Sequence, residues 1–357
     1  MRILFSLFFI LIAVTACKAE PSEDKLINSN TALKTAVITA GLDHPWALAF
    51  LPNGEYLITE RSGQLLRLSK DGKKTEITGV PTVYDKGQGG LLDVITAPDN
   101  KIYFSYAASD NTGKANTEVA RADLNLDQNR LENVEVIFKS APKVDGNNHW
   151  GSRLLLMTDG GLHVTLGERF DYRDEAQNSE NYLGTTAYIS PSGEASVFTY
   201  GNRNVQGIAM HPETGEVWAH EHGPKGGDEV NILKQGQNYG WPVVSYGRNY
   251  TGTEISETGK HEPDFEPPVL HWTPSIAPSG MMFYTGNKFN EWQGDLFVGA
   301  LAGSHLRRVK IDGTKVVEQE ELLKDLDARI RDVRQGPDGY IYILTDSGDG
   351  QLIRLTK

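Results

Sequence analysis

A short unit recurs six times along this chain and constrains its fold more than any other feature. Each copy joins two apolar segments through a polar turn, and the copies begin at Leu51, Ala97, Met157, His211, Glu291 and Gly336. Asn-Gly and Asp-Gly turns between alternating apolar residues favour β-hairpins, because both turn residues need positive φ. The turns lie at residues 54, 100, 160, 215, 294 and 339, at intervals of 46, 60, 55, 79 and 45 residues.

This repeat predicts an all-β fold, a six-bladed β-propeller. Four-stranded blades of roughly 40 to 50 residues fit a chain of 357 residues. The 37 glycines agree with a turn-rich β structure. The uneven intervals predict long inserted loops, around residues 170–200 and 240–285, on the face that carries the functional site. A β-sandwich with long loops is the alternative, but it leaves the repeated hairpins unexplained.

The N-terminus has the pattern of an export signal. Residues 1–16 hold one positive charge, a short apolar run and small residues before Cys17, the only cysteine in the chain. This ending resembles a bacterial lipobox, so we expect a lipoprotein signal over 1–16, lipidation of Cys17, a flexible tether over 17–33 and the propeller domain over 34–357. The protein would then face the periplasm, anchored to the outer membrane only through its lipid. The alternative is a simple signal peptide with an incidental cysteine.

The charge balance argues against a nucleic-acid partner. The chain has 35 Lys and Arg against 47 Asp and Glu, a formal net charge of −12. Nucleic-acid affinity depends on clustered basic residues that neutralise phosphates.

Polar, glycine-flanked clusters lie between the hairpins, at residues 87–93, 147–154, 201–207, 221–229, 238–242 and 328–332. In a propeller such segments meet at blade ends or along the central channel. They contain no zinc-protease motif, no nucleophile elbow and no phosphate-binding loop. Their histidine, glutamine, asparagine and arginines suit a base beside an anion-binding site. Three of the arginines, Arg203, Arg329 and Arg331, suggest a ligand with several carboxylates, and alternation on a strand would place the last two on one face.

These clusters resemble, in order and in wording, the soluble quinoprotein glucose/aldose sugar dehydrogenases that use pyrroloquinoline quinone (PQQ). The likeness runs from Gly41-Leu-Asp-His-Pro-Trp to the C-terminal Leu-Thr-Asp, which is nearly all of the mature chain. It implies a six-bladed propeller and a PQQ- and calcium-dependent oxidation of aldose sugars at C1 to lactones. Electrons would pass to an external acceptor such as a quinone, a cytochrome or a dye.

The resemblance also implies a role for each matched residue. His149 would be the general base that takes the anomeric hydroxyl proton as hydride leaves C1 for C5 of PQQ, and Gln88 would contact both cofactor and sugar. Arg203, Asn204, Arg329 and Arg331 would contact the cofactor. The carbonyls of Gly223 and Pro224 would bind the calcium ion that also holds PQQ, and a second, structural calcium would use the Glu229 carboxylate and the Tyr239 carbonyl.

Two positions depart from the glucose dehydrogenase pattern. Asn148 stands where that pattern has aspartate beside the sugar, and Gly303 stands where it has a cofactor-binding lysine. We therefore expect the backbone of Leu301, Ala302 and Gly303 to line the cofactor. These differences are more like the aldose sugar dehydrogenase branch of the family.

Two aromatic residues are weaker candidates. Tyr250 is a candidate ring contact to the cofactor. Trp272, shortly before Pro274, is a candidate platform for the sugar, although large aromatic residues near proline more often pack in a core.

Each expected chemical role has a purely structural alternative. His149 could be a buried histidine satisfied by its neighbours, Arg203 a salt bridge between blades, Arg329 and Arg331 a solvated charged strand, and Gln88 part of a turn. For the whole protein, one alternative is a non-enzymatic propeller that binds a carbohydrate or a protein. The other is a calcium-dependent, lactonase-like hydrolase, whose metal would want carboxylate side chains rather than Gly and Pro carbonyls.

Overall fold

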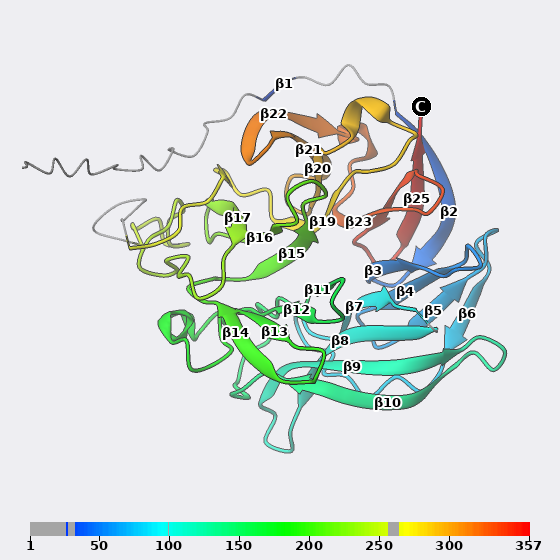
Figure 1. The fold of residues 1–357 in the computed structure, drawn as a ribbon, viewed down its shortest axis with the longest axis horizontal. Helices are drawn as coiled ribbons and strands as arrows, with labels where there is room; N and C mark the ends of the chain where they lie inside the picture. The colour runs from blue at the N-terminus through cyan, green and yellow to red at the C-terminus, as the bar shows by residue number, and fades with distance from the viewer. Residues whose placement is uncertain (1–25, 28–32, 99, 256–263) are drawn as a thin grey trace, which may run out of the picture.

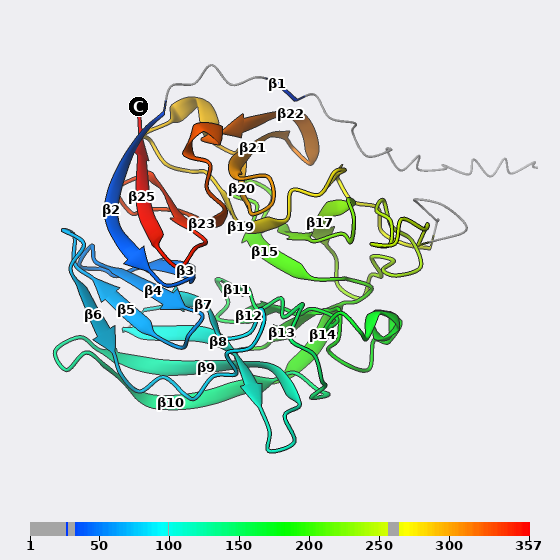
Figure 2. The same cartoon turned by 180° about the vertical axis from the view of Figure 1, so that it is seen from behind.

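The computed structural model describes residues 26–27, 33–98, 100–255 and 264–357, and within them the chain folds into six sheets around a common centre (Figures 1 and 2). Five of these sheets have four antiparallel strands, and the sixth has four antiparallel strands with the short parallel strand β1 (Leu26–Ile27) added at its edge. The first of the four antiparallel strands of each blade lies nearest the centre. The described ranges hold no α-helix, only the short 3-10 helices η1 (Arg173–Gln177), η2 (Asn290–Trp292) and η3 (Lys324–Leu326). The prediction of an all-β, six-bladed propeller is confirmed.

The first three blades follow one another along the chain, each running from the innermost strand outward. Blade 1 comprises β3 (Pro45–Phe50), β4 (Tyr56–Glu60), β5 (Leu65–Leu68) and β6 (Lys74–Ile77). Blade 2 comprises β7 (Leu91–Thr96), β8 (Lys101–Ser109), β9 (Ala115–Asn125) and β10 (Arg130–Lys139). Blade 3 comprises β11 (Leu154–Leu156), β12 (Leu162–Thr165), β13 (Thr186–Ile189) and β14 (Ala195–Thr199).

The last three blades complete the ring. Blade 4 comprises β15 (Val205–Met210), β16 (Val217–Glu221), β17 (Asp228–Leu233) and β18 (Leu270–Trp272). Blade 5 comprises β19 (Pro278–Phe283), β20 (Leu296–Ala300), β21 (His305–Asp312) and β22 (Lys315–Leu322). Blade 6 comprises β23 (Ile330–Gln335), β24 (Ile341–Thr345), β25 (Gly350–Thr356) and β2 (Lys34–Leu42).

Blade 6 is built from both ends of the propeller domain. Strand β2 pairs antiparallel with β25, from Lys34 opposite Thr356 to Leu42 opposite Gly350. In Figure 1 the C-terminus accordingly lies beside β2. Because the outermost strand comes from the beginning of the domain and the other three from its end, these backbone hydrogen bonds close the ring.

Part of the expected tether is described. Residues Leu26–Ile27 form β1, which pairs in parallel with β22 at the outer edge of blade 5. The expected signal over 1–16 and Cys17 lie outside the described residues, so export and lipidation stay predictions. Within the described ranges, no helix has the length and apolar character needed to cross a bilayer.

Inner strands are buried on both faces because each blade packs between two others. All five residues of β4, β16 and β24 are buried, as expected for strands covered on both sides. The largest apolar cluster lies between blades 1 and 2 and includes Trp46, Leu57 and Phe104. Full burial of such a side chain contributes about 1.5–3 kcal/mol relative to an exposed one.

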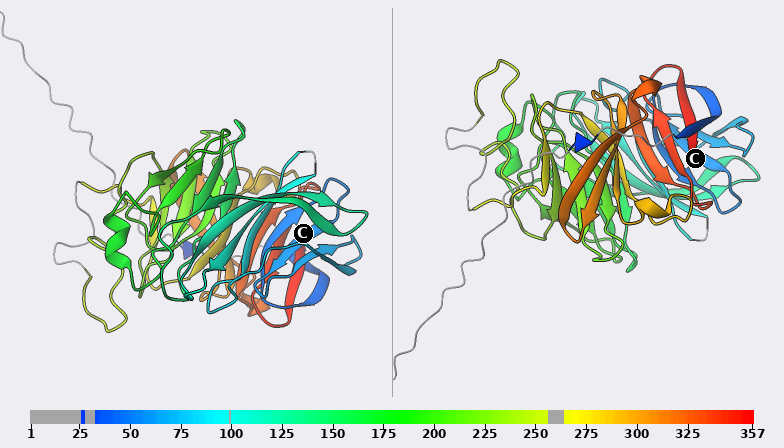
Figure 3. Two further views of the ribbon diagram at one scale, coloured as in Figure 1. Left: turned by 90° about the horizontal axis from the view of Figure 1, so that it is seen from below. Right: turned by 90° about the horizontal axis from the view of Figure 1, so that it is seen from above.

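The six recurring turns all join the first strand of a blade to its second. They therefore share one end of the blades, and the loops that enter the first strands share the other. Edge-on, the ring is a flattened disc with loops extending beyond one side (Figure 3). The two inserted loops are shorter than expected, because β13 and β14 occupy the end of the first range and β18 and β19 the end of the second. They touch each other where Arg173 bonds to Asn249 and Phe170 stacks on Tyr250.

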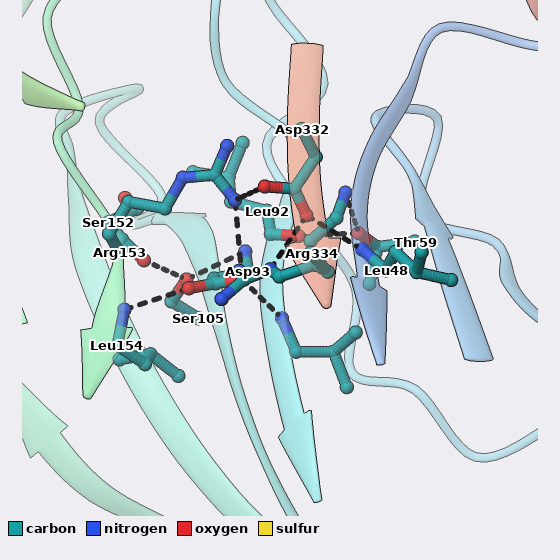
Figure 4. A network of polar contacts seen from close by, with 12 residues as sticks. Leu48, Thr59, Leu92, Asp93, Ser105, Ser152, Arg153, Leu154, Asp332 and Arg334 are labelled. Atoms are coloured by element: carbon teal, nitrogen blue, oxygen red, sulfur yellow. Dashed lines mark hydrogen bonds and ion pairs between the residues drawn. The ribbon is translucent and has the colours of Figure 1, made fainter. Parts of the chain in front are cut away.

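A buried network of four charged side chains ties the inner strands together (Figure 4). The Arg153 Nη1 lies 3.1 Å from Asp332 Oδ1 and 3.5 Å from Asp93 Oδ1, and Arg334 bonds to the same two carboxylates. Arg153 also donates to the carbonyls of Gln206 and Arg331. One guanidinium thereby joins blades 2, 3, 4 and 6.

Candidate functional site

A cavity of about 540 Å³ opens at the blade end opposite the recurring turns. Two kinds of segment line it: the residues at the start of the first strand of each blade, and the loops between the second and third strands. The lining residues are His44, Trp46, Arg61, Gln88, Leu92, Trp150, Gly151, Asn204, Gln206, His222, Ala277, Leu301, Arg329, Arg331 and Asp346. Five of the expected site residues are among them: Gln88, Asn204, Leu301, Arg329 and Arg331.

The loop that enters β11 brings His149 next to Gln88. The His149 backbone N–H donates to Gln88 Oε1 over 2.8 Å. His149 itself has a positive φ of 53°, and the backbone of Gly167 presses against it so closely that a Cβ there would lie 2.2 Å from the His149 carbonyl oxygen. Glycine at 167 therefore allows the β12–β13 loop to lie directly against the histidine.

Glu168 is a site residue that the sequence reasoning missed. Its Oε2 lies 2.6 Å from His149 Nδ1 and also accepts the Phe170 backbone N–H. The Glu168 side chain is buried. Because a carboxylate only accepts hydrogen bonds, it holds the proton on Nδ1 and leaves Nε2 with the free lone pair. Glu168 follows the second strand of blade 3, and its position in that loop was the only available signal.

The environment keeps His149 neutral. Burial lowers its pKa below the ordinary value, although the bond to Glu168 acts in the opposite direction. A neutral imidazole with its second nitrogen held by a carboxylate is suited to accept a proton.

Arg329 and Arg331 lie on one side of the cavity, as their alternation predicted. Both contact Asp346 Oδ2, Arg331 Nη2 at 2.8 Å and Arg329 Nη2 at 3.3 Å. Burial acts to raise the pKa of Asp346, but the guanidinium groups of Arg331 and Arg329 hold it below its usual range. The sequence reasoning did not identify Asp346, which follows the second strand of blade 6.

Arg203 and Asn204 are positioned by the loop that enters β15. Asn204 lines the cavity, and its Oδ1 accepts the Gly151 backbone N–H at 3.1 Å. Arg203 is buried beside the cavity and donates from Nη1 to the carbonyls of His222 at 3.1 Å and Gly223 at 2.9 Å. It thus faces the turn that was expected to bind calcium.

The aromatic candidates fall in different places. Tyr250 is 62% exposed and stacks on Phe170, whose ring packs edge-on against His149. Trp272 is buried in the core, where its indole N–H donates to Gln319. Trp272 is therefore a packing residue, and its expected contact with the sugar is wrong because the chain folds it into the body of blade 4.

Three further candidates for cofactor or sugar contacts, Ala302, Gly303 and Asn148, form hydrogen bonds through their backbones. The backbone N–H groups of Ala302 and Gly303 donate to the Ile276 carbonyl, which fixes the loop that carries Leu301 at the cavity. The half-buried Asn148, next to His149, accepts a bond from Arg169 Nε on its carbonyl.

A second, small cavity beside the first is suited to a cation. It is lined by Glu229 and Tyr239, as expected, together with Glu221 and Gly223. Glu221 and Glu229 lie directly opposite each other on β16 and β17. Burial and their mutual repulsion raise the pKa of Glu229, and burial raises that of Glu221. Asn231 Oδ1 is buried there without a hydrogen-bond partner among the described residues.

These oxygen donors fit a hard cation such as calcium. Like charges directly opposite each other in a ladder are destabilising unless something compensates them. Within the described ranges, no three or more His, Cys, Asp or Glu side chains cluster in the way a metal site requires. A calcium ion here would therefore draw on amide and backbone carbonyl oxygens as well as carboxylates.

Three comparisons place this architecture among known proteins. A family model described as glucose/sorbosone dehydrogenase matches residues 42–354. The chain is 41% identical over 341 residues to the aldose sugar dehydrogenase YliI of Escherichia coli (strain K12), covering 90% of this chain and 92% of that protein.

Solved structures agree with that match. The crystal structure of the soluble aldose sugar dehydrogenase from Escherichia coli, in its apo-form, has a TM-score of 0.87 at 40% identity and covers 91% of this chain and 99% of that one. The PQQ-bound form of an aldose sugar dehydrogenase from Streptomyces coelicolor has a TM-score of 0.76 at 26% identity, covering 91% and 98%.

Proposed function

The chain belongs to the glucose/sorbosone dehydrogenase family, and from that premise we propose that this PQQ-type aldose sugar dehydrogenase oxidises aldoses at C1 to lactones with His149 as general base. The observation that carries the proposal is the His149–Glu168 pair beside a cavity lined by Gln88, Arg329 and Arg331. An external acceptor would receive the electrons.

His149 would take the proton of the anomeric hydroxyl on Nε2 while C1 loses hydride. Glu168, bonded to Nδ1, would stabilise the imidazolium that results, because a buried carboxylate offsets the new positive charge. Gln88 is fixed by its bond to the His149 backbone, so its amide is placed to orient a hydroxyl at the same point. Proximity of this kind is worth little unless both groups are held rigidly.

PQQ would supply the two-electron acceptor that no amino-acid side chain provides. Arg329 and Arg331 would bind its carboxylates or quinone oxygen, Asn204 and the backbone of Leu301 would contact its edge, and Tyr250 would approach from the outer loop. The Gly223 and Pro224 carbonyls would hold calcium beside it, and Glu229 and Tyr239 a second calcium. The surplus of arginines over carboxylates in the cavity fits a polyanionic ligand.

Reconstitution tests this function directly. We expect the apoprotein, supplied with PQQ and calcium, to reduce an artificial dye when an aldose is added, and to lose this activity when a chelator removes calcium. The assay would cover a panel of aldoses, with PQQ binding followed by absorbance.

Each outcome separates the alternatives. PQQ binding without dye reduction by any aldose would contradict the assignment of aldoses as substrates. A non-enzymatic propeller gives no absorbance change with PQQ. A lactonase hydrolyses lactones without PQQ, and the same preparation can be assayed for that reaction.

The pH dependence of turnover should report the lowered pKa of His149. The neutral imidazole is the base, and burial favours it, so the base form persists further into acid than an ordinary histidine allows. We therefore expect the acid limb of kcat/KM to have its midpoint below about pH 6.5, the ordinary histidine pKa. An acid limb with its midpoint above the ordinary value would contradict this assignment.

A further inference from the structure

Arg61 lies in blade 1 at a position whose equivalents in other blades carry residues of the site. It follows β4, in the loop between the second and third strands, and lines the cavity. The corresponding loops of blades 3, 4, 5 and 6 carry Glu168, Gly223, Leu301 and Asp346. Blade 1 is next to blade 6, so Arg61 shares its side of the cavity with Arg329 and Arg331.

The backbone of Arg61 is held firmly. Its N–H donates to the His44 carbonyl, and its carbonyl accepts the Leu91 N–H at 3.2 Å. The Arg61 carbonyl also lies so close to Gly90 that a Cβ at residue 90 would be 2.0 Å from it. The arginine is therefore presented to the cavity from a fixed point.

Its guanidinium, in contrast, makes few hydrogen bonds with the residues that the structure describes. Nη1 donates to the Gly87 carbonyl at 2.8 Å, next to Gln88. Nε is buried and has no hydrogen-bond partner among the described residues. Arg329 and Arg331 differ in this respect, because both contact the Asp346 carboxylate.

The charges explain why this matters. Three arginines and one aspartate line the cavity. Asp346 already serves two of the arginines, and Arg61 adds to the positive field that holds down the pKa of Asp346 after burial has acted to raise it. A partly buried guanidinium that has spare donors, and forms no ion pair of its own within the described part of the chain, is a site for an anionic ligand.

We propose that Arg61 binds a carboxylate of the cofactor, in addition to Arg329 and Arg331, and through its bond to Gly87 couples that contact to the Gln88 turn. This inference rests on the proposed function, since it takes PQQ as the anion. A merely structural brace is the competing role, because the Gly87 bond alone could hold the turn.

The test is a PQQ titration followed by absorbance, with calcium present, at two salt concentrations. We expect Arg61→Gln to weaken PQQ binding about 10- to 100-fold, the range of a hydrogen bond to a charged group, and to reduce the salt dependence of binding. Arg61→Lys keeps the charge but loses the planar fork, so we expect a loss of about 3- to 10-fold. Arg121→Gln, which removes the same charge from an exposed pair with Glu135, serves as the control.

The readings separate the inference from the proposed function. If the wild-type protein does not bind PQQ, the proposed function fails. If the wild type binds PQQ and Arg61→Gln binds it equally well, Arg61 is only a brace and the inference is overturned. Should Arg61→Gln fail to fold, unchanged affinity in Arg61→Lys overturns it instead.

Discussion

Replacing His149 with glutamine is expected to lower kcat for aldose oxidation by about 10²- to 10⁴-fold, the range that a general base contributes, while PQQ still binds. Glutamine has no basic nitrogen, so nothing remains to take the hydroxyl proton. Its size lets it occupy the same pocket, and the backbone bond from residue 149 to Gln88 does not involve the side chain.

The comparison must separate chemistry from folding. Turnover would be measured by dye reduction at saturating PQQ and calcium, with PQQ affinity and the melting temperature measured on the same preparations. His163→Gln is a matched control, because His163 is a buried histidine in the same blade that packs against Tyr188 and Phe198. Retained turnover in His149→Gln would remove His149 from its role, whatever the control does.

The recurring hairpins predicted the fold well because of where they lie. Every one joins the first and second strands at the end of the blades away from the cavity. These turns must satisfy a backbone requirement, which is positive φ at glycines such as Gly54 and Gly339. They lie away from the cavity, so the proposed chemistry does not constrain their residues. Local conformational preference therefore selects similar turn residues in all six blades, and the repeat can be recognised in the sequence.

The site was predicted only in part, for an equally physical reason. Gln88 and Asn204 stand in glycine-flanked motifs that enter first strands, and Arg331 alternates with Arg329 at the start of another first strand. Patterns of this kind can be recognised in the sequence. Glu168, Asp346 and Arg61 are single residues in loops between second and third strands. Only the sheet register brings them to the cavity, so no local pattern marked them.

The expectation for Trp272 failed for a related reason. A proline two residues later marks the end of a strand equally well in the core and at a surface. The direction of the side chain decides the matter, and in blade 4 it points to Gln319 of the neighbouring blade. Burial of this kind follows from tertiary packing and leaves no mark in the adjacent sequence.

The buried charged network should make the largest single contribution to stability that one substitution can remove. We expect Arg153→Met to lower the free energy of unfolding by about 3–5 kcal/mol, the cost of breaking a buried ion pair by removing one partner. The variant leaves Asp93 and Asp332, both buried, to share Arg334 alone. The guanidinium also lies over the Trp46 ring, 4.0 Å from its centroid, and this cation–π contact is lost in the variant. Methionine is a long apolar side chain that covers part of the same ring, so the loss reports charge, hydrogen bonds and the cation–π contact more than volume.

Denaturant unfolding of the two proteins measures this difference, with Arg121→Met as the control. Arg121 pairs with Glu135 at the surface, and an exposed pair of that kind contributes about 0–1 kcal/mol. Because Arg153 also holds the carbonyls of Gln206 and Arg331, its loss should weaken PQQ binding even in molecules that remain folded. A loss of stability no larger than that of Arg121→Met would contradict the prediction and show that the network adds nothing measurable to the stability of the ring.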